Sequence, residues 1–297
     1  EESSGVVPAG EFLRTYNIRG SVPVGRKVVV VGGGNAAVDA ARTALRLGAE
    51  AVTIIYRRTR EQMPAYAEEI EEALHEGVEL RPLVQPIEVV ANERGETEGL
   101  RCETMTLGSF DRSGRRRPTR GKDGPFVLPA DQIIVAIGQR LDAGPIAGLA
   151  GLELNEHGFI ATDLTTGQTS VPWIFAGGDS VSGPSSVVDA IAAGERAAVG
   201  INLLLTGRVD AFWREESEVE TSYDPDAEPA PYPREAYRTI AVERRRQNFD
   251  EVEQPWCEAV TMRQAQRCLR CDYGKKIPRA AQPNPVVPVG TKEGLRA

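Results

Sequence analysis

The sequence predicts an α/β protein with a doubly wound parallel sheet, and three consecutive segments support this. The run Lys27–Val31 is continuously β-branched, which suits a central parallel strand covered on both faces. The segment Asn35–Leu47 has apolar residues at helical spacing, and Gly48 follows it as a C-terminal cap would. A second strand at Ala51–Tyr56 completes a βαβ unit within the roughly 30 residues that such a unit needs.

Composition supports a globular protein and excludes several kinds of partner. Of the 297 residues, 41% are hydrophobic and 26% charged, which is too apolar for a disordered chain. The net charge of −8 provides no global basic field for nucleic acid or anionic lipid. No apolar run approaches the roughly 18 residues that span a bilayer, and no signal-peptide pattern opens the chain. The 4 cysteines fit a reducing compartment, so we expect a cytoplasmic protein.

Further elements are expected along the chain. Alternating polarity over Leu100–Leu107 indicates a half-exposed antiparallel strand. The arginine-rich stretch Arg112–Lys122 is expected to be a solvated hairpin tip, with an anion site as the alternative. The remaining predictions are helices at Gly10–Arg14, 65–77 and 187–205, short strands at Val78–Leu80 and Ile87–Val90, and a buried strand at 130–138.

A glycine turn between the first strand and its helix predicts a nucleotide site. The segment Gly32–Ala37 reads G-x-G-x-x-A directly after a buried strand, which is the context that gives this motif meaning. Gly32 permits the tight turn, and Gly34 lets the backbone approach a pyrophosphate. At Asn35 and Ala36 the helix begins, and its N-terminal N–H groups favour a bound anion.

The end of the second strand indicates which dinucleotide is bound. A site for NAD usually places a carboxylate there to bind the ribose hydroxyls. Here Arg57 and Arg58 stand at that point, and guanidinium groups pair well with a phosphate. We therefore predict NADP(H); the alternative is an NAD(H) site flanked by exposed arginines.

A second site, half of a flavin pocket, is predicted further on. The run Ile174–Ala176 is expected to be a parallel strand ending at Gly178 and Asp179, whose carboxylate can accept a hydrogen bond from a ribityl hydroxyl. A helix then begins at Val187, and its N-terminal N–H groups suit the negative charge of a reduced flavin.

These motifs, in this order, resemble the glutamate synthase small-subunit family of NAD(P)H:FAD oxidoreductases. That family includes the larger subunit of electron-bifurcating ferredoxin:NADP oxidoreductase. The resemblance covers roughly residues 8 to 208. The motifs that carry it are Gly32–Asp39, Tyr56–Arg58, Met63–Ala65, Ala136–Gln139, Ala176–Asp179 and Ser185–Ile191.

The resemblance implies an NADP(H) domain inserted between two halves of an FAD domain. In such a protein residues 1–22 would be a connector, 23–135 the NADP(H) domain, 136–208 the carboxyl half of the FAD domain, and 209–297 an acidic, proline-rich linker with a cysteine-containing tail. It further assigns Gly32, Gly34, Asn35, Ala36, Arg57 and Arg58 to NADP(H), and Gly178, Asp179, Ser186, Val187 and Val188 to FAD.

One part of the family pattern is missing from the sequence. The family's first FAD half, with its own glycine turn, precedes the NADP(H) domain, whereas this chain opens at Glu1 shortly before its one such turn. We expect either a longer native polypeptide or another chain that supplies this half, because the adenosine and pyrophosphate contacts of FAD are not in this sequence.

Three cysteines in the tail form a C-x10-C-x2-C pattern: Cys257, Cys268 and Cys271. The segment around the last two resembles the opening of the family's cluster-binding segment, but two further cysteines do not follow. A [4Fe–4S] cluster ordinarily takes four thiolates, so a partner would supply the fourth ligand. A Zn²⁺ site with an outside ligand and reduced thiols on a docking helix are the alternatives.

Together, the two sites and the resemblance predict a flavin-dependent oxidoreductase subunit. Hydride would pass between NAD(P)H and FAD, and electrons would continue to iron–sulfur clusters, expected in a partner electron-transfer subunit. We expect catalysis through the cofactors rather than a side-chain acid or base. Two alternatives are a glutamate synthase small subunit proper and a non-catalytic scaffold subunit that keeps the fold without flavin.

Overall fold

The computed structural model describes residues 4–110, 114–139, 141–142, 144–146, 148–209, 233–265 and 267. The chain divides into two compact units, Glu1–Asp210 with Thr239–Gln254, and Ala211–Arg238 with Pro255–Ala297. Cys268 and Cys271 lie outside the described residues, so the structure does not bear on their predicted role.

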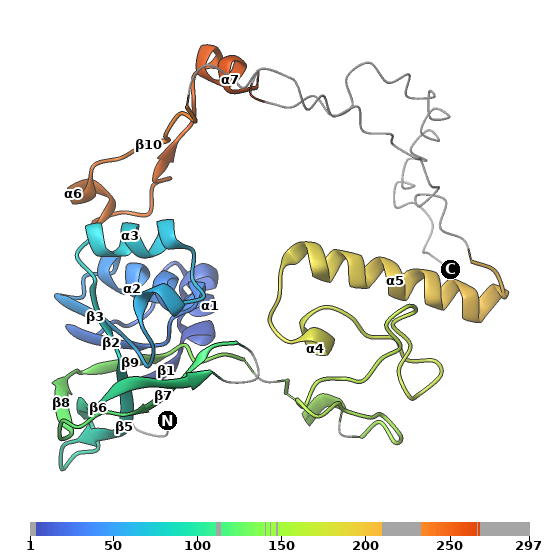
Figure 1. Cartoon of the computed structure of the whole chain (residues 1–297), viewed down its shortest axis with the longest axis horizontal. Helices are drawn as coiled ribbons and strands as arrows, with labels where there is room; N and C mark the ends of the chain where they lie inside the picture. The colour runs from blue at the N-terminus through green and yellow to red at the C-terminus, as the bar shows by residue number, and fades with distance from the viewer. Residues whose placement is uncertain are drawn as a thin grey trace, which may run out of the picture. The chain divides into compact units, whose positions relative to one another are not determined.

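A five-stranded sheet forms the centre of the first unit (Figure 1), and each of its neighbouring strands is parallel. The predicted α/β class is thereby confirmed. In spatial order the strands are β1 (Val6–Pro8), β9 (Gln132–Val135), β2 (Lys27–Val31), β3 (Ala51–Tyr56) and β4 (Glu79–Pro82).

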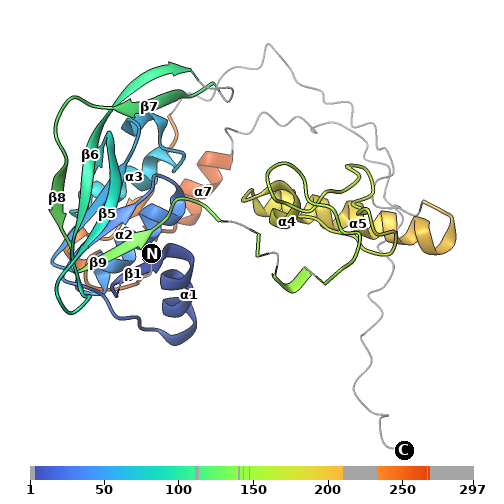
Figure 2. The same cartoon turned by 90° about the horizontal axis from the view of Figure 1, so that it is seen from below.

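Helices cover one face of this sheet and a second, antiparallel sheet covers the other (Figure 2). The central strand of the second sheet, β6, pairs with β5, β7 and β8. The helices are α1 (Ala9–Arg19), α2 (Asn35–Arg46) and α3 (Ala67–His75), and the strands are β5 (Val84–Ala91), β6 (Thr97–Phe110), β7 (Arg116–Arg120) and β8 (Phe126–Pro129).

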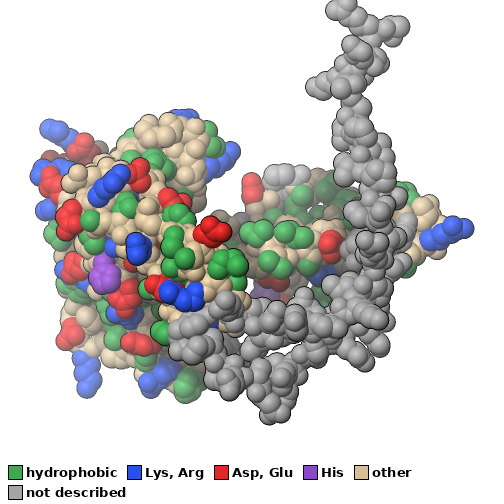
Figure 3. Space-filling view, turned by 90° about the horizontal axis from the view of Figure 1, so that it is seen from above, with side chains coloured by type: hydrophobic (Ala, Val, Ile, Leu, Met, Phe, Trp, Pro, Cys, Tyr) green, Lys and Arg blue, Asp and Glu red, His purple; other side chains and the backbone are tan. Residues whose placement is uncertain are grey.

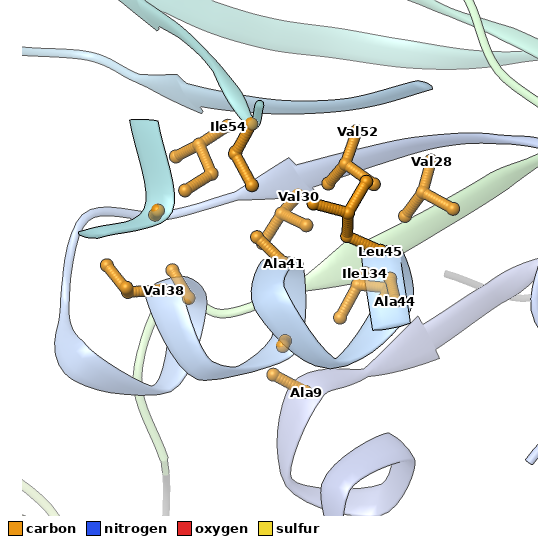
Figure 4. Packing of buried hydrophobic residues seen from close by; sticks show 14 of the residues in the cluster. Ala9, Val28, Val30, Val38, Ala41, Ala44, Leu45, Val52, Ile54 and Ile134 are labelled. Atoms are coloured by element: carbon orange, nitrogen blue, oxygen red, sulfur yellow. The ribbon is translucent and has the colours of Figure 1, made fainter. Parts of the chain in front are cut away.

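Alternation along β2 explains why its four residues after Lys27 are all valine. Val28 and Val30 point to the side of the sheet that the helices cover, and Val30 lies beside Ala41 of α2 (Figure 4). Val29 and Val31 point to the antiparallel sheet and join its core. Because Val28–Val31 are buried on both faces, apolar side chains are favoured at all four positions, and the run of valines follows from this.

The first residues of the chain belong to the same sheet. β1 pairs with β9 through Val6 and Ile133, and Phe12 of α1 is fully buried in the core. The sequence predicted no strand at Val6–Pro8, because a three-residue strand carries too little sequence signal to be recognised. The arginine-rich stretch expected to be a hairpin tip likewise contains a strand, β7.

Within the first unit, residues 148–209 form a lobe around α5 (Val187–Thr206). This lobe includes the short helix α4 (Asp179–Ser182), and the 3₁₀ turn Gly144–Ile146 precedes it. The strand expected at Ile174–Ala176 is absent among the described residues. Only an isolated bridge, Gln168 with Phe175, occurs there, and it is antiparallel. A parallel strand needs parallel backbone partners on its flanks, and among the described residues of this lobe the backbone partners are antiparallel or local.

The segment after the linker contains β10 (Arg238–Thr239) paired with β11 (Glu253–Gln254), α6 (Val242–Arg245) between them, and α7 (Glu258–Ala265). Within the second unit Tyr237 stacks on Trp256, with ring centroids 4.8 Å apart. Among the residues described, we find no helix with the length and hydrophobicity to cross a membrane.

Candidate functional site: a dinucleotide turn and half of a flavin pocket

The glycine turn lies at the carboxyl end of β2, where the sheet meets the first turn of α2. Gly32 has φ 148°, a conformation that side-chain-bearing residues rarely adopt, and its N–H donates to the carbonyl of Ile55 at 3.0 Å. A Cβ atom on Gly32 would lie 2.3 Å from the carbonyl oxygen of Ala136. The first position of the motif therefore allows two neighbouring backbone segments to approach the turn.

Gly33 is required for a reason that the motif itself does not reveal. A Cβ atom there would lie 2.6 Å from the ring of Tyr56, so the ring packs directly over the turn. The Tyr56 hydroxyl donates to the carbonyl of Gln62 at 3.0 Å. Sequence reasoning missed this pair, because the contact joins residues more than 20 positions apart.

The loop after β3 folds back onto the turn. Ala65 N–H donates to the carbonyl of Gly33 at 3.1 Å, and Tyr66 N–H donates to Oδ1 of Asn35 at 3.0 Å. The side chain of Asn35, predicted to bind the nucleotide, thus also holds this loop against the helix start. The Met63–Ala65 motif, to which the sequence assigned no role, lies beside the nucleotide turn for this reason.

The N-terminus of α2 is open for an anion. Gly34 is the N-cap, no side chain caps the helix, and no acidic residue lies in its first turn. Asn35 and Ala36 are exposed, and the heavy atom nearest to a Cβ built on Gly34 is Cγ of Pro64 at 4.0 Å. Uncapped N–H groups and the positive end of the helix dipole favour a phosphate at this point.

The two arginines after β3 occupy different environments. Arg57 is exposed and forms no ion pair with another residue that the structure describes. Arg58 is only 8% exposed, and its Nε donates to the carbonyl of Arg116 in β7 at 3.1 Å. Arg57 is therefore placed to meet a ligand in solvent, whereas at least one N–H of Arg58 is bound to the neighbouring sheet.

The predicted flavin residues lie together in the lobe around α5. The N-cap of α5, Ser186, accepts a hydrogen bond from Asp189 N–H at 3.1 Å, and both Ser185 and Ser186 donate to the Asp189 carboxylate at 2.7 Å. These hydroxyl groups hold the pKa of Asp189 below its usual value of 3.8. Asp179 Oδ1 accepts a hydrogen bond of 3.3 Å from Ser185 N–H, which brings the two motifs together.

The first turn of α5 retains exposed groups. Val187 and Val188 are 76% and 74% exposed, and the Ser186 cap occupies only the N–H of Asp189. Hydrophobic side chains gather on the lobe that carries this helix (Figure 3). A pocket of about 220 Å³ borders the site and is lined by residues including Asp163, Gly177, Gly178, Ser185, Asp189 and Arg196.

Small residues let α5 pack closely on its own lobe, as the sequence predicted. The Cβ of Ala193 would lie 2.9 Å from a Cβ on Gly177, and that of Ala190 would lie 3.5 Å from one on Gly178. A side chain at Gly177 would push this segment away from the helix, whereas a Cβ on Gly178 would be in ordinary contact with Ala190. The loop geometry around Asp179 therefore depends on close helix contact rather than on a strand.

Of the tail cysteines, only Cys257 is described; it is exposed, and its carbonyl accepts from Thr261 N–H at 3.0 Å. No cluster of three or more potential metal ligands occurs among the residues that the structure describes. Cys102 is buried in β6, and this burial raises the pKa of its thiol to about 11.

Residues 8–194 match the sequence profile of a family described as pyridine nucleotide-disulphide oxidoreductase. The chain is 42% identical over 284 residues to the NADP(+)-dependent formate dehydrogenase subunit beta of Moorella thermoacetica, covering 91% of this chain and 39% of that protein. It is 41% identical over 180 residues to the glutamate synthase [NADPH] small chain of Escherichia coli, covering 60% of this chain and 38% of that protein. The chain thus spans well under half of either relative.

Among solved structures, FprA of Mycobacterium tuberculosis in complex with NADPH superposes with a TM-score of 0.54. The two proteins are 20% identical, and the match covers 71% of this chain and 62% of FprA. At this identity the likeness establishes the fold alone, and it agrees with the parallel sheet and the glycine turn described above.

Proposed function

We propose that this chain, which belongs to the pyridine nucleotide-disulphide oxidoreductase family, is a subunit of an NADPH-dependent flavoprotein that transfers electrons. The observation that carries the proposal is the open N-terminus of α2, with an exposed arginine at the neighbouring strand end. The flavin half and the tail extend the proposal but are not needed for the nucleotide site itself.

The residues around the glycine turn fit NADP(H). The space beside Gly34 would admit the pyrophosphate, with hydrogen bonds from the N–H groups of Asn35 and Ala36. Arg57 would pair with the 2′-phosphate, since an exposed guanidinium that has no ion-pair partner among the described residues can form a bidentate pair with a phosphate. Binding of NAD(H) at the same turn, with the arginines left in solvent, is the alternative.

The residues of the α5 lobe fit one part of FAD. Asp179 would accept a hydrogen bond from the ribityl chain, and Gly178 lets the backbone turn beside it. Behind the Ser186 cap, the N–H groups of Val187 and Val188 would stabilise negative charge on the flavin ring. A bound flavin accepts hydride from a nicotinamide and releases electrons singly. The adenosine part of FAD would be held by residues outside this sequence, in a longer polypeptide or in another chain.

Partner subunits and iron–sulfur clusters belong to the same proposal. Relatives of this chain carry the words "subunit beta" and "small chain" in their names, which supports a multi-subunit assembly. Cys257 is exposed at the start of α7, so its thiol is accessible to a [4Fe–4S] cluster shared with Cys268, Cys271 and a partner's ligand. A reducing cytoplasm would suit both the cluster and free thiols.

A second function has its own support. The similarity to the E. coli glutamate synthase small chain favours an assembly that delivers electrons to a glutamine-hydrolysing partner. Purification of the native assembly distinguishes the two, because a glutamate synthase would contain a large amidotransferase subunit. An assembly with iron–sulfur electron-transfer subunits and no amidotransferase would favour the first function.

Titration calorimetry of the chain with NADPH and with NADH tests the proposal. We expect NADPH to bind more tightly, and Arg57→Ala to remove most of this preference. Arg94→Ala is the matched control, because Arg94 is an exposed arginine at the tip of the distant β5–β6 hairpin. Equal binding of the two nucleotides by the wild-type chain would refute the NADP(H) assignment.

Visible spectroscopy of the native assembly tests the flavin and the cluster. We expect absorption near 450 nm, which is typical of flavins, and we expect Asp179→Ala to lose it. An assembly without flavin would instead be a scaffold that retains the fold. Broad absorption that dithionite bleaches, and that Cys257→Ser weakens, would support the [4Fe–4S] cluster. Bound zinc in an assembly that lacks this absorption would instead indicate a Zn²⁺ site.

A further inference from the structure

The strand end that carries the nucleotide arginines is joined to the antiparallel sheet. Arg58 follows β3, and its Nε donates to the carbonyl of Arg116, the first residue of β7, at 3.1 Å. β7 is the outer strand in the order β5-β6-β7. The side chain of Arg58 therefore links the end of β3 to the first residue of β7.

A second connection between the same two elements runs through the backbone. Leu83 N–H donates to the carbonyl of Arg58 at 3.0 Å, and Met105 N–H donates to the carbonyl of Leu83 at 2.7 Å. Met105 in turn pairs with Arg120 of β7. Leu83 has φ 57°, and it is the one non-glycine residue with positive φ in the described part of the chain. Such a conformation persists where the surroundings hold it in place, and such sites are concentrated at functional positions.

This junction links β7, which carries several arginines, to the end of β3. Arg120 is paired with Glu103, and Nε of Arg116 donates to the carbonyl of Gly108 at 3.1 Å. Arg117 is exposed and has no ion-pair partner among the residues described. Arg117 directly follows Arg116, the residue whose carbonyl Arg58 contacts. Arg57 and Arg117 therefore present guanidinium groups from two elements that are joined at this point.

We propose that the β6–β7 hairpin forms a second wall of the 2′-phosphate site, in which Arg117 binds the phosphate together with Arg57. In this arrangement Arg58 is a positioning residue, since it holds β7 at the strand end. The inference rests on the proposed binding of NADP(H) at the glycine turn. It accounts for a basic strand in a chain of net charge −8, which as a whole would repel an anionic ligand.

Calorimetric titration of four variants with NADPH and NADH tests this wall: Arg57→Ala, Arg117→Ala, Arg58→Ala and the control Arg94→Ala. A hydrogen bond to a charged group is worth roughly ten- to a hundredfold in affinity. We expect Arg57→Ala and Arg117→Ala each to weaken NADPH by at least about tenfold and NADH by less than about twofold. Arg94→Ala should change neither affinity, and the midpoint of thermal unfolding of each variant reports that it is folded.

A double-mutant cycle tests the positioning role of Arg58. If Arg58 holds β7 in place, Arg117→Ala should weaken NADPH binding less in an Arg58→Ala background than in the wild type. Arg58→Lys, which keeps one donor for the Arg116 carbonyl, should restore part of the NADPH preference. Additive effects of the two substitutions would refute this role.

The outcomes separate this inference from the proposed function. If Arg57→Ala weakens NADPH while Arg117→Ala behaves as Arg94→Ala does, the hairpin is not part of the site and the NADP(H) assignment stands. If Arg57→Ala also leaves NADPH affinity unchanged, the proposed nucleotide site itself is wrong.

Discussion

Nη2 of Arg42 donates a 2.7 Å hydrogen bond to Oε1 of Glu76, a side chain that is completely buried at the end of α3. Nη2 of Arg46 donates to the same oxygen at 2.8 Å. Arg245, from the segment after the linker, is 4% exposed and pairs with Glu72 beside them. Since a buried carboxylate must be paired, these arginines are part of the domain's structure and attach residues 239–254 to it.

Removal of one member of this cluster should destabilise the domain strongly. Arg42→Ala leaves the buried carboxylate of Glu76 under-compensated, so we expect a loss of about 3–5 kcal/mol in the free energy of unfolding. Arg26→Ala is the matched control, because its pair with Glu50 is largely exposed and is screened by solvent, so its loss should change stability little. Urea unfolding of both variants measures the difference. Equal losses would contradict the structural role of the buried cluster.

Attachment of the segment after the linker should depend on Arg245. The carbonyl of Arg245 accepts from Nε of Arg46 at 2.8 Å, and its guanidinium pairs with Glu72. We expect Arg245→Ala to speed hydrogen exchange across 240–254, because the segment opens locally. Arg244→Ala, which removes an exposed pair with Asp250, should leave exchange near the wild-type rate. Unchanged exchange in both variants would show that other contacts, such as the stacking of Tyr16 on Phe249, suffice.

The second and third glycines of the turn should respond differently to the same substitution. Gly33→Ala places a methyl group 2.6 Å from the Tyr56 ring, so we expect a loss of about 1–3 kcal/mol in stability together with weaker NADPH binding. Gly34→Ala meets no heavy atom closer than 4.0 Å, so the fold should be retained. Its methyl group would occupy the space proposed for the pyrophosphate, and binding alone should fall. Thermal unfolding and calorimetry separate the two effects.

The start of α5 should be sensitive to acid. Hydrogen bonds from Ser185 and Ser186 hold the pKa of Asp189 below its usual 3.8 in the folded protein. Because the folded pKa is lower than the unfolded one, the stabilisation is present above about pH 4 and is lost as the pH falls through the folded pKa. NMR titration should show the Asp189 pKa rising in Ser185→Ala. Ser180→Ala, whose hydroxyl donates to Gly177 instead, should leave it unchanged.

The two described cysteines should differ in reactivity. Cys102 is fully buried with a thiol pKa raised to about 11, so at pH 8 only about one thiol in a thousand would be ionised. Cys257 is exposed. Brief treatment of the native chain with iodoacetamide, followed by peptide mass spectrometry, should find Cys257 modified and Cys102 intact. Modification of Cys102 before unfolding would contradict its burial.

The sequence predicted the elements whose signals are local. The β-branched run of β2, the helical spacing of α2 and the glycine turn between them are all read from adjacent residues, and the structure contains each one. The helix near Gly10 and the antiparallel strand around Leu100 were predicted from the same kind of periodicity and were confirmed as α1 and β6.

Predictions failed where an element depends on distant partners. The strand at Ile174–Ala176 is hydrophobic enough, but its described neighbours form only one bridge. In the opposite direction, β1 and β7 form strands despite weak local signals. β1 completes the sheet beside β9, and β7 pairs with β6.

What the sequence by itself determined is the local geometry: a glycine turn that opens a helix, followed by arginines at a strand end. Which side chains act there was decided by tertiary structure. Gly33 must be a glycine because Tyr56 packs on it, and Arg58 is held by Arg116, a residue 58 positions away. The physical reason is that a turn and a helix start arise from interactions between neighbours, whereas burial and hydrogen-bond partners exist only after the chain has brought distant residues into contact.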